Sequence, residues 1–337
     1  MDFFALGTPV IDEFARVDGK GLAKLGLKKG ATNYFSAAKL ASIERLLSKK
    51  ITYRYPGDNA RNVCEGFAAL GGFCGFAGAV GSDKAGAEFE ANLLECGIAP
   101  FLQEKKGSTG KILALVTPDG QRTFAADLGV SGDCDEFDAL ALSESRMFYA
   151  SSITLLVKPV CSLAIRYLDE AKKRKKNITI AIENPPMVET NSKKLIALVK
   201  KYADFVFLNE DEANALFGTR AVEKAGRKKS GKISNSLLEK KLALLKPSAL
   251  IYLKKGEKGS FLFHKGRKWH VPALKANAID TTGAGDAYAA GTLYGLSRGY
   301  SPLGSAKIGC MLATKVVQKI GAGIPMRHTR LKTRHMH

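Results

Sequence analysis

The chain has 337 residues, of which 45% are hydrophobic and 25% are charged, as in an ordinary globular protein. This length is enough for a large core in one domain or two modest ones. No apolar run approaches the roughly 20 residues that span a bilayer, and no basic segment precedes the short apolar N-terminus, so we expect a cytoplasmic protein without a signal peptide.

The net charge of +20 is the unusual bulk property, because such a field attracts anions, including nucleotides and nucleic acids. The excess is concentrated in the runs Lys172–Lys176, Lys224–Lys232 and Arg327–His337. No aromatic residues interleave with these runs, as a stacking platform for nucleic acid would require. We therefore favour a solvated positive surface and keep a basic nucleic-acid-binding protein as the alternative that charge alone suggests.

The six cysteines form no Cys-x-x-Cys pair, and no histidine stands at zinc-ligand spacing from them. Most of them lie in apolar stretches. We expect buried free thiols in a reducing compartment.

The first third of the chain alternates between strand-like and helical patterns. The apolar run Met1–Gly7 is predicted to be a first buried strand. Helices are expected over 59–70 and 85–96, with a strand over 75–80 between them. This succession is typical of an α/β fold.

Two segments break this alternation. Residues 13–55 contain short strand candidates around a helix near 37–48. Residues 108–127 are predicted to be a β-hairpin, because Asp119-Gly120 separates two β-rich runs. Since neither segment fits inside a doubly wound sheet, we expect them to form a small β lid over a substrate site.

The rest of the chain, from about residue 158, again alternates. Strands near 178–182, 205–208 and 249–253 are separated by helices near 191–200 and 210–217. Continuous apolar strands separated by helices indicate a doubly wound, mainly parallel sheet with helices on both faces. The last helical run is expected at 311–320.

These expectations define three parts. The α/β core is assigned to 1–12, 56–107 and 128–326, the β lid to 13–55 and 108–127, and a basic tail, expected to be disordered, to 327–337.

The sharpest motif is Asp280-Thr281-Thr282-Gly283-Ala284-Gly285-Asp286, which runs into an Ala-rich helical pattern. Gly283 and Gly285 allow a tight turn and close approach to a ligand. The free N–H groups at the helix start, together with the helix dipole, form an anion site. Asp286 falls in the first turn, where a carboxylate can accept the proton of an attacking hydroxyl.

A bare Gly-x-Gly-Asp is also compatible with a plain helix cap, and no Walker-type phosphate loop is present. Two further segments narrow the choice. They are Pro56-Gly57-Asp58-Asn59-Ala60-Arg61-Asn62, followed by Leu70-Gly71-Gly72, and Asn209-Glu210-Asp211-Glu212. With Asp280–Asp286, they resemble in order and spacing the motifs of the ribokinase-like (PfkB) carbohydrate and nucleoside kinase family.

The resemblance implies a ribokinase-like fold and ATP-dependent phosphorylation of a hydroxyl group, with Mg²⁺ required. It implies that Asp286 is the catalytic base and that the amides of Gly283, Ala284 and Gly285 form an anion hole. It assigns Asn209, Glu212 and Gly256 to the nucleotide, with Glu212 reaching Mg²⁺ through water. A capping box at Asn209 and Glu212 is an equally compatible interpretation.

A monovalent cation near Asp280 and Thr282 is a further implication of the resemblance. The acceptor is assigned to Asp12, Gly57, Asp58, Asn62, Phe124 and Ala126. For Phe124 and Ala126, which alternate on one strand, packing within the lid is the alternative. Arg61 and Arg122 are candidates for pairing with an anion or with Asp58, or for a solvated surface position.

The resemblance is strongest to the adenosine-kinase-like branch of the family, through Thr117–Phe124, Asn184-Pro185-Pro186 and Leu293–Leu296. It implies a small-molecule partner, most simply the 5′-hydroxyl of adenosine or a related purine nucleoside, and a monomer or homodimer. A sugar kinase of the ribokinase or fructokinase type is the alternative, and a non-catalytic family member is a third. Asp58 stands where the family has a second glycine, which weakens any transfer of substrate identity.

Overall fold

A computed structural model describes residues 1–218, 233–319 and 321–324. Its larger sheet has nine strands in the order β14-β13-β12-β11-β10-β9-β1-β5-β6. The strands are β1 (Phe3–Leu6), β5 (Cys74–Gly81), β6 (Ile98–Lys105), β9 (Met147–Ser151), β10 (Asn177–Ala181), β11 (Phe205–Asn209), β12 (Leu250–Lys254), β13 (Ser260–His264) and β14 (Arg267–Val271). All neighbours are parallel except β12–β13 and β13–β14.

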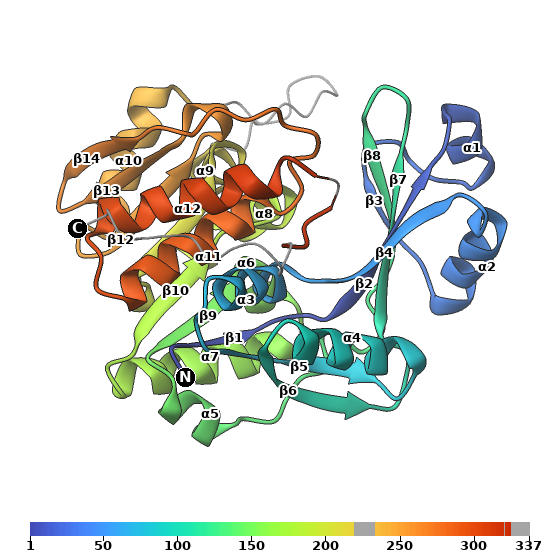
Figure 1. The fold of residues 1–337 in the computed structure, drawn as a ribbon, viewed down its shortest axis with the longest axis horizontal. Helices are drawn as coiled ribbons and strands as arrows, with labels where there is room; N and C mark the ends of the chain where they lie inside the picture. Colours follow the sequence, from blue (N-terminus) through green and yellow to red (C-terminus); the bar gives the residue numbers. More distant parts are fainter. Residues whose placement is uncertain (219–232, 320, 325–337) are drawn as a thin grey trace.

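Alternate residues of β1 enter two different cores, because successive side chains of a strand point to opposite faces. Phe3 and Ala5 pack with α3 (Asn59–Ala69), α4 (Lys84–Glu95), α11 (Ala284–Ser297) and α12 (Pro302–Val316). Phe4 and Leu6 pack with α5 (Ala139–Glu144), α6 (Ser152–Leu156), α7 (Val160–Lys173), α8 (Pro185–Tyr202), α9 (Glu210–Phe217) and α10 (Asn235–Leu245). Helices thus cover both faces (Figure 1), as the sequence predicted.

The smaller sheet has the order β3-β8-β7-β2-β4 and stands beside the larger one (Figure 1). Its strands are β2 (Val10–Arg16), β3 (Thr32–Tyr34), β4 (Ile51–Gly57), β7 (Gly110–Val116) and β8 (Arg122–Asp127), with helices α1 (Gly19–Lys24) and α2 (Ala37–Leu47). The chain enters this sheet twice, first with β2, β3 and β4 and then with β7 and β8. β2 and β4 extend a few residues beyond the lid boundaries given above, so Asp12 and Gly57 lie within the smaller sheet.

One face of the smaller sheet is covered by its own helices, through contacts of Leu22 and Leu40 with Leu113 and Ala125. Because side chains alternate along β8, Phe124 and Ala126 lie on the opposite face. Arg122 shares that face and bonds Asp280 of the larger part. The uncovered face therefore looks toward the α/β core.

Several elements differ from the sequence expectations. The last helix is Pro302–Val316 rather than 311–320, because Ser301 caps it and Pro302 occupies its first turn. α8 begins at Pro185, with Asn184 as its N-cap. The hairpin β13–β14 was missed, although its turn residues Lys265 and Gly266 both have positive φ, the conformation that a two-residue hairpin turn requires.

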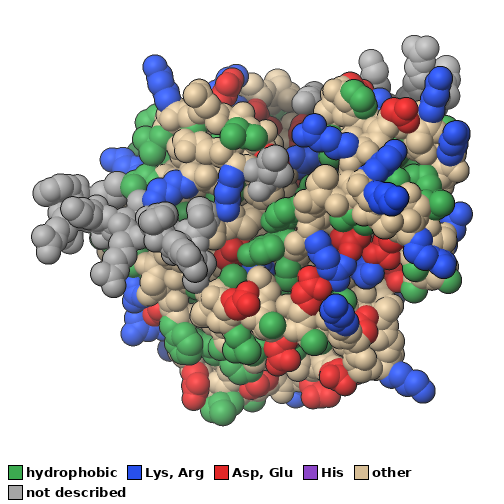
Figure 2. All heavy atoms as spheres, turned by 45° about the vertical axis from the view of Figure 1, so that its right-hand side comes forward, with side chains coloured by type: hydrophobic (Ala, Val, Ile, Leu, Met, Phe, Trp, Pro, Cys, Tyr) green, Lys and Arg blue, Asp and Glu red, His purple; other side chains and the backbone are tan. Residues whose placement is uncertain are grey.

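Other sequence predictions have clear outcomes. All six cysteines are free and buried, as expected. Within the described ranges, no helix combines the length and the apolar character needed to cross a bilayer. The basic run Lys224–Lys232 and the tail Arg327–His337 lie outside the described residues. On the face shown in Figure 2, Lys and Arg side chains are spread over the surface with Asp and Glu among them.

Glycines set the close approach of α11 to α12. A Cβ added at Gly291 would lie 2.8 Å from both the Cα of Gly309 and the carbonyl oxygen of Ile308. Both obstacles are backbone atoms, which cannot move aside like a side chain. Because Gly291 has no side chain, the helix that carries Asp286 can pack directly against the backbone of α12.

We expect Gly291→Ala to destabilise the protein by about 1–3 kcal/mol, the usual cost of overpacking, in spite of the better helix propensity of alanine. Denaturant unfolding measures this change. Gly19→Ala is the matched control, because no atom lies within 4 Å of its added Cβ. Equal stability of the two variants would contradict the packing argument.

Candidate active site

The N-terminus of α11 lies at the carboxyl edge of the parallel sheet, where ligands bind in open α/β folds. Gly283 is the N-cap residue, with φ 74°, and no described side chain caps this helix start. A Cβ at Gly283 would lie 2.7 Å from the Cα of Ala322. The chain thus needs glycine here for both conformation and space, and the first amides of α11 face outward without a competing side-chain acceptor.

Asp286 lies in the first turn of α11, and its Oδ2 accepts a 3.0 Å hydrogen bond from the Asn62 amide. Burial raises the pKa of Asp286 to about 7. This value is the net result, since Asp58 and Glu212 also act to raise the pKa, whereas the Asn62 hydrogen bond and Lys254 act to lower it. A carboxylate with a pKa near neutrality is well matched to accept a proton.

Asp12 is the second carboxylate of this region. Its side chain lies directly against Gly57, where any Cβ would collide with its Oδ2. Burial and the neighbouring Asp58 together raise the pKa of Asp12 to about 7, against the lowering effect of Arg61. The structure thus brings Asp12, Gly57, Asp58, Asn62 and Asp286 into one region.

Asp58 occupies a backbone conformation with φ 140°, in which side chains are rarely found. Its Oδ1 accepts from the Arg61 N–H at 2.9 Å and caps α3. Its Oδ2 accepts from the backbone N–H and the hydroxyl of Thr8 at 2.8 and 3.1 Å. The carboxylate is therefore held by three donors of the protein.

The nucleotide side was assigned to Asn209, Glu212 and Gly256. Asn209 caps α9, and its Oδ1 accepts from the Glu212 N–H at 2.9 Å while Glu212 Oε2 accepts from the Asn209 N–H at 2.5 Å. The capping box allowed by the sequence is therefore present. Gly256 lies in the turn after β12, two residues beyond Lys254.

Lys254 was missed by the sequence reasoning. It ends β12, and its Nζ lies 2.9 Å from the place of a Cβ at Gly285 and 4.0 Å from Glu212 Oε2. A cation therefore lies beside the anion site at the start of α11. The only sequence signal was its position at the carboxyl end of a buried strand.

Glu183, just after β10, was also missed. Its Oε1 accepts from the Tyr149 hydroxyl at 3.3 Å, while its Oε2 has no hydrogen-bond partner within the described residues. Burial raises the pKa of Glu183 well above its usual range, and the nearby Asp286 adds to this shift. Glu183 therefore contributes, like Glu212, a buried acidic group to the same edge of the sheet.

Asp280 was assigned to a monovalent cation with Thr282. Its carboxylate accepts from the backbone N–H and hydroxyl of Thr282, from the Gly321 N–H and from Arg122. These interactions hold the pKa of Asp280 down at about 2 against the effect of burial. While Arg122 occupies this carboxylate, the arrangement does not fit a cation bound by Asp280.

The inward face of the smaller sheet carries Phe124 and Ala126 together with Phe14 and Tyr53. The Phe14 and Tyr53 rings meet edge to face at 5.4 Å, and Phe124 is half-buried. Sequence reasoning found Phe124 but missed Phe14. Phe14 lies two residues after Asp12 on β2 and therefore on the same face of the sheet. The result is an aromatic face on the side of the smaller sheet that also carries Asp12.

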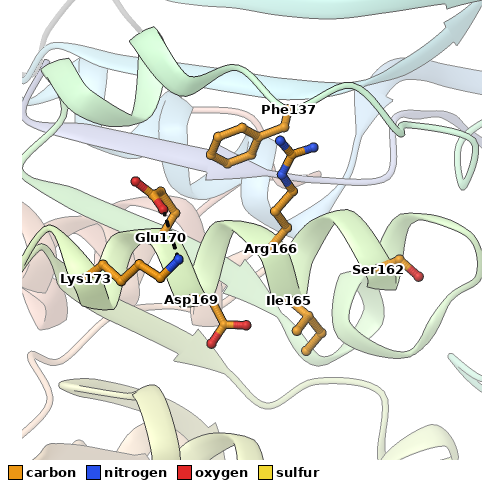
Figure 3. Close-up of a pocket in the computed structure, with 7 residues that line it drawn as sticks. All are labelled: Phe137, Ser162, Ile165, Arg166, Asp169, Glu170 and Lys173. Atoms are coloured by element: carbon orange, nitrogen blue, oxygen red, sulfur yellow. Dashed lines mark ion pairs between the residues drawn. The ribbon is translucent and has the colours of Figure 1, made fainter.

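A separate hollow lies along α7, lined by Phe137, Arg166, Glu170 and Lys173 among others (Figure 3). The Arg166 guanidinium lies 4.3 Å from the centre of the Phe137 ring, and Lys173 pairs with Glu170. None of the predicted site residues lines this hollow. The candidate active site is therefore at the edge of the sheet and not here.

Comparison with known proteins agrees with this location. The model of the pfkB family carbohydrate kinases matches residues 27–329. The chain is 28% identical over 341 residues to adenosine kinase of Saccharomyces cerevisiae, which covers 95% of this chain and 96% of the yeast protein. It is 29% identical over 252 residues to a fructokinase of Escherichia coli, covering 72% and 77%.

Solved structures show the same fold. Adenosine kinase from Sinorhizobium meliloti superposes with a TM-score of 0.81 at 25% identity, covering 96% of this chain and 95% of that one. A probable sugar kinase from Rhizobium etli CFN 42 gives a TM-score of 0.82 at 22% identity, covering 95% and 94%.

The fold and the site together define an ATP-dependent kinase of small molecules with a ribokinase-like architecture. The chain belongs to the pfkB family of carbohydrate kinases. Both the fold class and the family predicted from the sequence are thereby confirmed.

We expect Asp286→Asn to lower kcat by about 10²–10⁴-fold, the usual contribution of a general base, and to stabilise the fold at pH 8. Because the pKa of Asp286 is raised on folding to about 7, the wild-type carboxyl favours folding below pH 4 and loses that contribution as pH rises through 7. The variant has no such loss. Turnover assays and thermal unfolding at pH 4 and pH 8 measure both effects.

Asp138→Asn is the control, because this carboxylate caps α5 away from the site. It should leave kcat unchanged. Near-normal turnover of Asp286→Asn would contradict the assignment of the base, and an equal Tm difference at both pH values would contradict its raised pKa.

Proposed function

We propose that this kinase transfers the terminal phosphoryl group of ATP to the 5′-hydroxyl of adenosine or a related purine nucleoside, with Asp286 as the general base. The observation that carries the proposal is a half-buried carboxylate, hydrogen-bonded to Asn62, with a pKa near 7 in the first turn of an uncapped, glycine-started helix. Proton acceptor and anion site are then adjacent, as phosphoryl transfer to a hydroxyl requires.

The acceptor side would hold the sugar and the base separately. Asp12 and Asn62 would bind sugar hydroxyls, with Gly57 leaving room for the Asp12 side chain and Asp58 fixing the start of α3. Phe124, Ala126 and the newly found Phe14 would cover the base, since aromatic faces stack on nucleobases. The relation to adenosine kinase over nearly the whole chain supports a nucleoside over a simple sugar.

The nucleotide side would receive the phosphates of ATP. The amides of Gly283, Ala284 and Gly285 would contact the transferred group, and Lys254 would lie beside it as a positive charge. Asn209, Glu212 and Gly256 would border the rest of the nucleotide.

Mg²⁺ bound with ATP would neutralise part of the phosphate charge. Within the described ranges, no group of three or more His, Cys, Asp or Glu side chains is arranged to hold a metal ion. The ion would therefore depend on phosphate oxygens and water, with Glu212 as an indirect contact, as is usual for Mg²⁺ in kinases.

A sugar kinase is the second candidate, and the fructokinase relative favours it. The test is ATP-dependent phosphorylation of adenosine, inosine, ribose and fructose at equal concentrations. We expect the highest kcat/KM with adenosine. We also expect Phe124→Ala to lower kcat/KM for adenosine about 10-fold or more, because it removes ~1–3 kcal/mol of base stacking.

The sugars would lose little by this substitution, because they have no base to stack. A kcat/KM for fructose or ribose above that for every nucleoside would overturn the proposed acceptor while leaving Asp286 as the base. No turnover with any acceptor would overturn both.

The smaller sheet, with residues 13–55 and 108–127 as its centre, is proposed to close on the acceptor as a lid. Hydrogen exchange over 111–126 should slow when adenosine is added, because closure protects backbone amides from solvent. Strand β14 at the far edge of the larger sheet is the internal control. Unchanged exchange over 111–126 at saturating acceptor would contradict closure.

A further inference from the structure

Arg61 is the largest side chain that is completely buried in the described structure, with 0% exposure. Its Nη1 donates to Glu65 Oε2 at 2.7 Å and to Asn62 Oδ1 at 3.2 Å. Its Nη2 donates to the Tyr55 hydroxyl at 3.1 Å and to Asn92 Oδ1 at 2.5 Å. The expectation of a solvated Arg61 is therefore wrong, and so is that of pairing with Asp58 through its side chain.

These contacts fix the orientation of the Asn62 amide. A guanidinium can only donate, and an ionised carboxylate can only accept. The amide atom that faces Arg61 must therefore be the oxygen, and the one that faces Asp286, at 3.0 Å, must be the NH₂ group. A flipped amide would place its oxygen against the carboxylate and lose both bonds.

The guanidinium is itself held from several directions. Glu65 Oε1 accepts from the Tyr55 hydroxyl and from the Ile324 N–H, both at 2.9 Å. The guanidinium also lies 4.6 Å from the centre of the Tyr55 ring. The smaller sheet, α3, α4 and the segment after α12 thus converge on one immobile donor.

A buried ion pair is weak evidence for a role in stability, because desolvation offsets most of the attraction. In other proteins, replacing a buried ion pair by well-packed apolar side chains of similar volume is often neutral for stability. Apolar side chains could not, however, donate a hydrogen bond to Asn62 as the fixed guanidinium of Arg61 does.

We infer that Arg61 is a positioning residue, whose guanidinium locks the Asn62 amide so that its NH₂ group holds the catalytic carboxylate of Asp286. The inference rests on the proposed function of Asp286 as the base. It makes Arg61 part of the active site without contact to substrate or nucleotide.

The dependence of kcat on pH reflects the ionisation of Asp286 and of the charged and titratable groups near Asp286 and Arg61. Asp286 is faced by Asp58, Glu183, Glu212, Lys254 and Tyr149. Arg61 is faced by Asp12, Tyr53, Tyr55, Glu65, Cys64 and Cys96. Arg61→Lys keeps the number of charges in both groups and removes only the forked donor geometry.

We expect Arg61→Lys to lower kcat about 10-fold, since small misplacements of a reacting group can cost about 100-fold. The acid limb of the kcat profile should move to higher pH, because Asp286 loses a donor that favours its ionised form. The KM for ATP should change less than 2-fold, because no described contact links Arg61 to the nucleotide side.

Asn92→Ala is the matched control. It removes a different hydrogen bond of the same guanidinium, at 2.5 Å, and leaves the contact with Asn62 in place. It should lower stability but keep kcat and the acid limb of the wild type. If Arg61→Lys does not fold, Arg61→Gln with Glu65→Gln removes both buried charges together and should show the same loss of kcat.

A double-mutant cycle gives the decisive measurement, because residues that act through one another are not additive. In an Asn62→Ala background, Arg61→Lys should change kcat less than 2-fold. Independent, multiplicative effects, or a wild-type kcat and acid limb in Arg61→Lys, would overturn the inference while Asp286→Asn remained inactive. An active Asp286→Asn would instead overturn the proposed function.

Discussion

The Asp286 carboxylate must stay in a half-buried position although its partial loss of water disfavours the charge, and the arrangement around it follows from that constraint. A capping side chain would occupy one of the free amides at the helix start and stand in the way of an anion, and the N-cap residue of α11 is instead Gly283, which has no side chain. A closer α12 would shift the helix, and the Gly291–Gly309 contact fixes that distance. Asn62 and Lys254 moderate the pKa of the carboxyl and bring it to a value useful near neutral pH.

The charges around the site are divided between its two sides. In the proposed function Asp12 and Asp286 lie on the acceptor side, where the hydroxyl groups of an acceptor would donate to them, while Asp58 already accepts from three donors of the protein. Lys254 and the amides of α11 lie on the other side, which suits the phosphates of a nucleotide. Such a division would orient the two substrates before any reaction takes place.

The sequence was most informative where chemistry and local structure coincide. Asp280–Asp286 predicted the turn, the helix and the carboxylate together, because glycine spacing and helix capping are local properties. The parallel sheet also followed from local patterns, since its strands are apolar runs separated by helices. The lid could be predicted as two excursions, but its limits could not, because β2 and β4 pair across a distance of about forty residues.

Residues whose role depends on long-range contacts were missed or misjudged. Lys254 lies at the end of β12 and Glu183 just after β10. Their part in the site can be seen only when the sheet places these strand ends beside Glu212 and Asp286. The sequence left Arg61 open between pairing with an anion, pairing with Asp58 and a solvated position, because its actual partners Glu65, Tyr55 and Asn92 converge on it only in the folded chain. Asp58 departs from the family motif, and its three donors became visible only with Thr8 in place.

The Arg122–Asp280 pair gives the two parts of the molecule different sensitivities to their surroundings. Because the pKa of Asp280 is about 2, this link between the sheets keeps its charges across the whole range in which Asp286 and Asp12 titrate. It is only partly buried, with 35% of the Arg122 side chain exposed, so dissolved ions can screen it. Raising the ionic strength would therefore weaken this contact between the smaller sheet and the α/β core. A change of pH would instead alter the protonation of Asp286 and Asp12 and leave the Arg122–Asp280 pair charged.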